Sequence, residues 1–315
     1  MPTPENKPQT QSSSIASPTR PLWFYHALAL VTVLIWSFSF LHIIILNEEI
    51  DPVSLVVLRK DIFAIGLIAL LLWRRPKLSH LTRGQWGLVI AMSLVAGPMY
   101  HFTFAWSTGE GRIDVALLGL IIATVPIHTG WMGWLFLKEK LTLIKVIALA
   151  LGLLGVITVI VGRRGGIDLL PEEMAGPIGA MCAAMLAAGG SILTRACRNA
   201  LGPLDLFSVT GAILLITIVP FHAMTDFQRI GEMNPLGWWA AVYLGVFGSG
   251  IAYFAWVAAL SGLQALNVAM YLFLASILAA LWGWIFRGET IGWPFALGGV
   301  LVLTGLALPA LGKST

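Results

Sequence analysis

The sequence predicts an all-α integral membrane protein with ten transmembrane helices, arranged as two inverted five-helix repeats. The composition is the first observation, because 58% of the residues are hydrophobic and 11% are charged, whereas a soluble domain has about 25% charged residues. The charged residues also gather between apolar runs of roughly 20 residues, the length of a helix that crosses a bilayer. These runs are too long and too uniformly apolar for barrel strands.

The order of the apolar runs fixes the predicted domains. Residues 1–21, rich in Pro, Ser, Thr and Gln, are expected to form a disordered cytoplasmic tail. The first run is too long for the core of a signal peptide and is expected to remain as a helix. Residues 22–162 form the first predicted repeat and residues 163–315 the second. The ten runs are 22–46, 53–73, 86–106, 114–137, 141–162, 174–195, 204–224, 236–260, 263–287 and 292–312.

A duplication inside the chain is the third observation. The segment from Pro126 to Glu139 recurs 150 residues later as the segment from Ser276 to Glu289 (276 − 126 = 150). An odd number of helices per copy makes the second copy enter the membrane upside down, and such repeats place a substrate site near the midplane. The identical pairs at this offset include Ile127/Ile277, Gly133/Gly283, Trp134/Trp284, Phe136/Phe286, Glu139/Glu289 and Gly155/Gly305.

The basic residues indicate how the chain lies in the membrane. Most Lys and Arg side chains fall in the loops on the side of the N-terminus, which predicts cytoplasmic termini in a plasma (inner) membrane. These basic residues explain the net charge of +4, which therefore gives no reason to expect a nucleic-acid partner. Cys182 and Cys197 lie on one predicted helix about 22 Å apart, which is too far for a disulfide.

Several short motifs resemble those of the drug/metabolite transporter superfamily, in its EamA-like family. The resemblance covers roughly residues 25–310 and implies a ten-helix secondary transporter, often an exporter of amino acids or related metabolites. It also implies alternating access with the fifth and tenth helices at the periphery. The second copy has Ser276 where the family has proline. The motifs are Asp51-Pro52 followed by Leu58-Arg59, Pro126 with Gly133 and Glu139, and Gly283 with Glu289.

Charged residues inside the second run are the first candidates for a site. Arg59, Lys60 and Asp61 lie six to eight residues into this run, at a depth where charges are costly and are functional candidates by default. Arg59 would bind a substrate carboxylate. Alternatively, Arg59 and Lys60 extend to the outer interface and Asp61 pairs locally.

Proton coupling has three candidates, Asp61, His42 and His101, which are expected at similar depths. Histidine titrates near physiological pH, so a cluster of these residues would couple transport to protons. The alternative is that each histidine is a hydrogen-bonded wall residue. Pro126 is a candidate hinge, because proline frees a backbone carbonyl and kinks a helix, although a static packing kink explains it equally well.

Aromatic and amide side chains complete the predicted site. Gln264, Asn267 and Tyr271 have helical spacing and are expected on one inward face. The aromatic surface suits a small, partly apolar, zwitterionic substrate, whereas core packing or interhelical hydrogen bonding is the alternative. The substrate-binding candidates are Trp36, Arg59, Tyr100, His101, Tyr253, Trp256, Asn267 and Tyr271.

The expected partners are a small-molecule substrate and the lipid bilayer, with no cofactor and no metal. A homodimer is compatible with the sequence, which leaves the oligomeric state open. The alternative function is an integral membrane lipid-modifying enzyme or a scramblase. The sequence contains no GxSxG, HExxH, CxxC or P-loop pattern, so an enzyme is not favoured.

Overall fold

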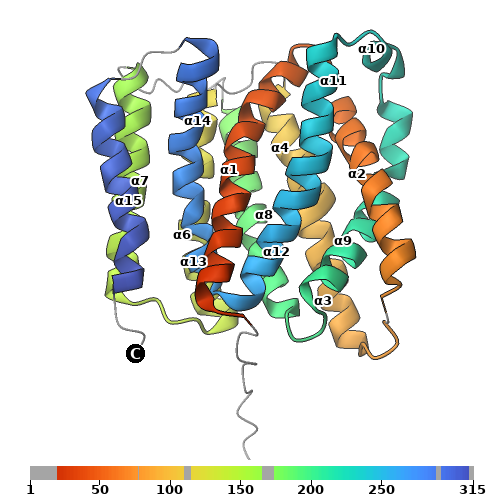
Figure 1. Cartoon of the computed structure of the whole chain (residues 1–315), viewed down its shortest axis with the longest axis horizontal. Helices are drawn as coiled ribbons and strands as arrows, with labels where there is room; N and C mark the ends of the chain where they lie inside the picture. The colour runs from red at the N-terminus through yellow and green to blue at the C-terminus, as the bar shows by residue number, and fades with distance from the viewer. Residues whose placement is uncertain (1–19, 77, 110–114, 165–173, 289–291, 312–315) are drawn as a thin grey trace, which may run out of the picture.

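Helices make up all the regular structure that the computed structural model describes, which covers residues 20–76, 78–109, 115–164, 174–288 and 292–311 (Figure 1). Seven helical stretches are long and apolar enough to cross a membrane, and shorter apolar helices accompany them. The chain is therefore a multi-pass membrane protein. The first helix begins and the last helix ends on the same side of the molecule, which we call the terminal side (Figure 1).

The helices follow one another along the chain with few other elements between them. Residues 95–99 and 243–251 are π-helical, residues 219–224 form a 3₁₀ helix, and the remaining elements are α-helices. The bounds are α1 Leu22–Asn47, α2 Pro52–Arg74, α3 Arg83–Leu94, η1 Val95–Met99, α4 Tyr100–Thr108, α5 Val115–Ile122, α6 Val125–Leu137, α7 Leu143–Arg164, α8 Ala175–Cys197, α9 Pro203–Ile218, η4 Val219–Met224, α10 Phe227–Gly231, α11 Pro235–Val242, η5 Tyr243–Ile251, α12 Ala252–Gly262, α13 Ala265–Ala269, α14 Tyr271–Arg287 and α15 Trp293–Leu311.

Several predicted helices are interrupted where the sequence analysis expected continuous ones. The third run is divided by η1, where Pro98 lacks a backbone donor and Gly97 leaves the helical region. The eighth run contains η5, and residues 245–249 of η5 are related to η1 by the repeat offset of 150 (95 + 150 = 245, 99 + 150 = 249). The fourth run breaks between Ile122 and Val125, and the ninth run breaks at Met270.

The duplicated motif shapes two equivalent helix ends. α6 ends at Lys138, whose φ of 56° is left-handed, and α14 ends at Gly288, whose φ is 65°. In both cases the backbone N–H of this cap residue donates to the carbonyl of the motif glycine, Gly133 or Gly283. A left-handed residue after a helix turns the chain and satisfies end carbonyls, so the repeated motif encodes a helix terminus. Glu289 lies outside the described residues.

Close backbone packing joins α7 and α15 at one edge of the molecule (Figure 1). A Cβ atom at Gly155 would lie 2.6 Å from the Gly298 carbonyl oxygen, and one at Gly298 would lie 2.4 Å from the Gly155 carbonyl oxygen. A Cβ atom at Gly305 would lie 2.7 Å from the Ala148 carbonyl oxygen. The pair Gly155/Gly305 of the internal duplication therefore lies at this interface, where small residues allow close contact.

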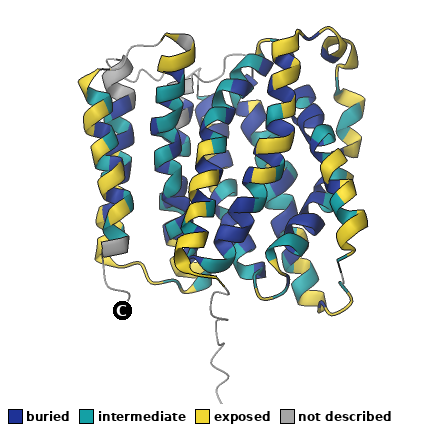
Figure 2. Ribbon diagram, in the orientation of Figure 1, coloured by how far each residue is buried: buried dark blue, intermediate teal, exposed yellow. Residues whose placement is uncertain are grey.

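Exposed residues lie along the outer faces of the helices (Figure 2), and many of them are large and apolar. On α2, for example, Ile65 is 74% exposed and Trp73 is 76% exposed. Inside, Ala180, Ala184 and Ala188 of α8 are fully buried against a cluster that includes Phe104, as expected of a seam of small residues. Lipid would cover the apolar exterior, while the helices bury small and polar residues between them.

Candidate functional site

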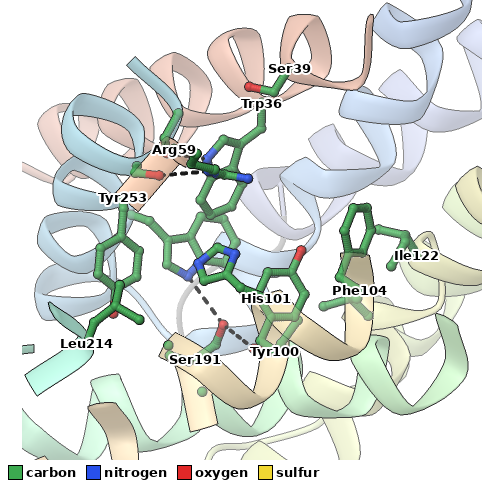
Figure 3. A pocket seen from close by; sticks show the side chains of 18 of the residues that line it. Trp36, Ser39, Arg59, Tyr100, His101, Phe104, Ile122, Ser191, Leu214 and Tyr253 are labelled. Carbon is green, nitrogen blue, oxygen red and sulfur yellow. Dashed lines mark hydrogen bonds between the residues drawn. The ribbon is translucent and has the colours of Figure 1, made fainter. Parts of the chain in front are cut away.

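A cavity of about 140 Å³ lies inside the helix bundle (Figure 3). Elements from both halves of the chain line it, whereas no residue of α7 or α15 does so. The elements that line it are α1, α2, η1, α4, α5, α6, α8, α9, η5, α12 and α14. The cavity is therefore the natural candidate for a small-molecule site.

Two buried cations from α2 form one wall of this cavity. Arg59 is 9% exposed and Lys60 is 2% exposed. Arg59 Nε donates to Ser249 Oγ at 2.8 Å, and Lys60 Nζ donates to the same oxygen at 3.1 Å. Lys60 Nζ also lies 2.9 Å from His101 Nε2. Neither cation extends to the outer interface.

The hydrogen bonding of these cations is incomplete. Ser249 Oγ takes the Arg59 Nε–H, but the two terminal amino groups of Arg59 make no hydrogen bond among the described residues. No Asp or Glu is found among the described residues that line the cavity. A buried charge without a counter-ion costs several kcal/mol. An anionic ligand would remove this cost, and a guanidinium group binds carboxylates in a bidentate manner.

Aromatic side chains also line the cavity, and hydrogen bonds hold two of them in place. Trp36 Nε1 donates to the Gly248 carbonyl of η5 at 3.0 Å, and Trp256 Nε1 donates to Ser191 Oγ at 3.3 Å. The rings of Trp36 and Trp256 are 5.2 Å apart. The π-helical register of η5 thus supplies both Gly248 and Ser249 to the site.

The predicted substrate-binding residues divide into two groups. Six of them line the cavity, and Asn267 and Tyr271 do not. The Tyr271 hydroxyl shares a hydrogen bond of 3.0 Å with His26 Nδ1, and Asn267 Oδ1 is buried without a partner. Gln264 bonds to Lys145 on α7, and the three residues Gln264, Asn267 and Tyr271 do not face the cavity together. The six that line it are Trp36, Arg59, Tyr100, His101, Tyr253 and Trp256.

The three proton-coupling candidates do not cluster. Asp61 accepts from His222 Nε2 at 3.1 and 3.2 Å, on a different side of α2 from the cavity. His42 stacks on Tyr243 at 4.1 Å between ring centroids, and only His101 lines the cavity. Consecutive helical residues point about 100° apart, so Lys60 and Asp61 face different neighbours. The sequence analysis missed His222 as a partner of Asp61, although both residues lie in apolar runs.

The candidate hinge lies at the start of a helix. Pro126 is in the first turn of α6, directly after the break that follows α5. Its counterpart by the repeat offset, Ser276, lies inside the continuous α14 and lines the cavity. The two halves therefore differ here, as the missing proline of the second copy led us to expect. Other cavity residues that the sequence analysis did not single out are Ser191, Thr194 and Thr210.

On the terminal side of the cavity, Glu139 joins three helical segments. Its carboxylate accepts from the Ala265 backbone N–H at 3.0 and 3.2 Å and from Arg195 Nε at 3.3 Å. Arg195 Nη1 donates to the carbonyls of Leu260 and Ser261 at 2.8 and 3.3 Å. We call Glu139, Arg195 and the Ala265 N–H the Glu139 clamp. The clamp binds helix-end groups and does not line the cavity.

Comparisons with known proteins identify the family. The model of the EamA-like transporter family matches the chain twice, over residues 23–161 and 174–310. The chain is 23% identical over 279 residues to the uncharacterized transporter YoaV of Bacillus subtilis (strain 168), covering 87% of this chain and 92% of that protein. It is 25% identical over 280 residues to an uncharacterized transporter of Archaeoglobus fulgidus, covering 88% and 95% of the two chains.

A solved structure shares the fold. It aligns with a TM-score of 0.75 and 20% sequence identity, over 91% of this chain and 96% of the other, and is described only as the crystal structure of a protein. The double family match, the relatives named as transporters and the apolar helices agree with one another. The chain belongs to the EamA-like transporter family and is a multi-pass membrane transporter.

Proposed function

We propose that the chain is a secondary active transporter of small carboxylate-bearing metabolites, amino acids or related compounds, and that it works by alternating access as an exporter. The observation that carries this proposal is a cavity inside the helix bundle where two basic side chains of α2 are buried and where the described lining residues include no Asp or Glu. A carboxylate would neutralise charge there, and the apolar and aromatic walls would receive the rest of the molecule.

Ten spans in two inverted repeats support alternating access. To the seven candidate spans we add α2, α7 and α15, which gives ten (7 + 3 = 10). The two repeats, residues 22–162 and 163–315, make equivalent contacts. α1 packs against α12 and α14 of the second repeat, and the corresponding helix α8 packs against α4 and α6 of the first. α7 and α15, the last helices of the two repeats, pack on each other.

The terminal side of the cavity is closed in this structure. α6 packs against α13, and the Glu139 clamp and a cluster that includes Tyr25, Leu260 and Val268 lie on that side. With cytoplasmic termini, this is an inner closure. Transport would then require the Glu139 clamp to open while the outer side closes, and the break before Pro126 provides a point at which α6 can move relative to α5.

Proton coupling is assigned to Asp61 with His222. Asp61 is an acidic residue well inside an apolar helix, and it is bonded to a second titratable group. The pair lies outside the cavity, so it would respond to protons without contacting substrate. His101 contacts Lys60 inside the cavity and would instead sense bound substrate.

The experiment that tests the function is uptake into proteoliposomes from a pooled mixture of amino acids and other small acids, measured by mass spectrometry with and without a pH gradient. Selective accumulation that Arg59→Gln abolishes supports the proposal. The matched control is Arg74→Gln, because Arg74 lies at the exposed end of the same helix and pairs with Asp205. No accumulation above empty liposomes, from folded protein, would favour the enzyme or scramblase alternative.

A further inference from the structure

We infer that the cavity selects organic acids with a net negative charge and an apolar body, such as 2-oxo acids, over the zwitterionic amino acids of the same shape. This inference rests on the proposed function and names the substrate class within it. It follows from the charges and the hydrogen-bonding groups that the cavity presents, taken one at a time below.

The charge of the cavity has one sign. Arg59 and Lys60 both line it, and in the part of the chain that the structure describes no Asp or Glu does so. Two acidic groups on elements that line the cavity or adjoin them are engaged elsewhere, because Asp61 accepts from His222 and Glu139 accepts from Arg195 and Ala265. An amino acid would bring an ammonium group for which the cavity offers no carboxylate.

The position of that ammonium group would be unfavourable. In an amino acid the amino group is on the carbon next to the carboxylate, so a carboxylate held by Arg59 places the ammonium close to both cations. Arg59 and Lys60 already converge on one oxygen, Ser249 Oγ, at 2.8 and 3.1 Å. A third cation beside them would be repelled, and the repulsion is strong where water is excluded.

The hydrogen-bonding groups of the cavity favour an acceptor at the same carbon. The terminal amino groups of Arg59 have no hydrogen-bond partner among the described residues. A lysine ammonium has three donors, and Lys60 makes two contacts, to Ser249 and His101. The carbonyl oxygen of a 2-oxo acid accepts hydrogen bonds, whereas an ammonium group only donates. The oxo group therefore matches this donor-rich wall, and the amino group does not.

The remaining walls fit a compact apolar body. Trp36, Tyr100, Phe104, Ile122 and Leu214 also line the cavity (Figure 3). The cavity measures about 140 Å³, and an engineered protein cavity of about 150 Å³ is known to hold benzene. A branched aliphatic chain or a single ring is therefore about the size of group that this volume holds, and the cavity is partly open to the rest of the molecule.

Two ligand pairs test the inference, because the members of each pair differ only at the second carbon. The pairs are 4-methyl-2-oxopentanoate with L-leucine and phenylpyruvate with L-phenylalanine. Binding to the purified full-length protein is measured by titration calorimetry, and competition for uptake is measured in proteoliposomes. We expect each oxo acid to bind about tenfold or more tightly than its amino acid. Arg59→Gln should weaken oxo-acid binding by about 30-fold or more, whereas Arg74→Gln should leave it unchanged.

The outcomes separate the inference from the proposed function. Equal or tighter binding of the amino acids would overturn the inference, since it would mean that aromatic faces such as Trp36 and Trp256 accommodate the ammonium group. Transport of amino acids alone would leave the proposed function standing. Binding of none of the four acids would also overturn the inference, and the proposed function falls only if the pooled mixture shows no accumulation either.

Discussion

The Glu139 clamp should control how often the terminal side of the cavity opens. Glu139→Gln removes the charge but keeps an oxygen that can accept from the Ala265 N–H. The ion pair with Arg195, with both side chains nearly buried at 12% and 11% exposure, is lost. Arg195 keeps the Leu260 and Ser261 carbonyls as acceptors, so it is not left unpaired.

The size of the effect follows from these contacts. A hydrogen bond to a charged group contributes about 1.5–3 kcal/mol, so we take about 2 kcal/mol for the loss. Since 1.4 kcal/mol corresponds to a factor of ten, the population of the open form should rise about thirtyfold.

Hydrogen exchange at residues 263–269 measures this opening. Ala265 is in the first turn of α13, where backbone N–H groups have no intrahelical acceptor, and Glu139 supplies its acceptor. We expect faster exchange there in Glu139→Gln. The control is Glu232→Gln, because Glu232 is an exposed residue that accepts only from Gln228 at 3.0 Å. Exchange at residues 263–269 that matches the wild type would refute the role of the clamp.

Three further predictions concern packing, coupling and the aromatic wall. Gly298→Ala should lower the melting temperature, because its Cβ would lie 2.4 Å from a backbone oxygen of α7. A Cβ at the adjacent Gly299 meets nothing within 4 Å, so Gly299→Ala should be neutral or stabilising. Equal melting temperatures of the two variants would contradict the α7–α15 interface. Asp61→Asn should abolish accumulation driven by a pH gradient. It should leave substrate affinity unchanged, since Asp61 does not line the cavity. An unaltered response to the gradient would exclude Asp61 from proton coupling. Trp36→Phe keeps a ring but removes the hydrogen bond to the Gly248 carbonyl. Substrate affinity should fall about five- to tenfold, the equivalent of about 1 kcal/mol for one hydrogen bond. Unchanged affinity would show that this bond does not position η5.

Several features of the site follow from depth along the sequence. Arg59, Lys60 and His101 lie at similar depths in two apolar runs, and the structure brings Lys60 and His101 within 2.9 Å. Trp36, in the middle of the first run, lines the cavity. Depth is set by counting residues at a rise of 1.5 Å each, so the sequence is sufficient for it.

The side of a helix on which a side chain finds its partner is harder to predict. It depends on unbroken helical geometry and on neighbours distant in the chain. Asp61 faces His222, which is 161 residues away. Asn267 and Tyr271 have the spacing of one helical face but do not line the cavity, and Ser249 lies in the π-helical stretch η5. No local pattern of residue types identified these partners.

The sequence by itself determined the membrane class, the apolar runs, the family and the duplicated helix end, because each depends on composition or on order along the chain. The tertiary structure decided which polar groups meet. Ser249 receives both cations of α2 across 190 and 189 residues, and Glu139 reaches Ala265 across 126. Such pairings depend on how helices pack and where they break, since a polar group inside the bundle takes whichever partner the neighbouring helix presents.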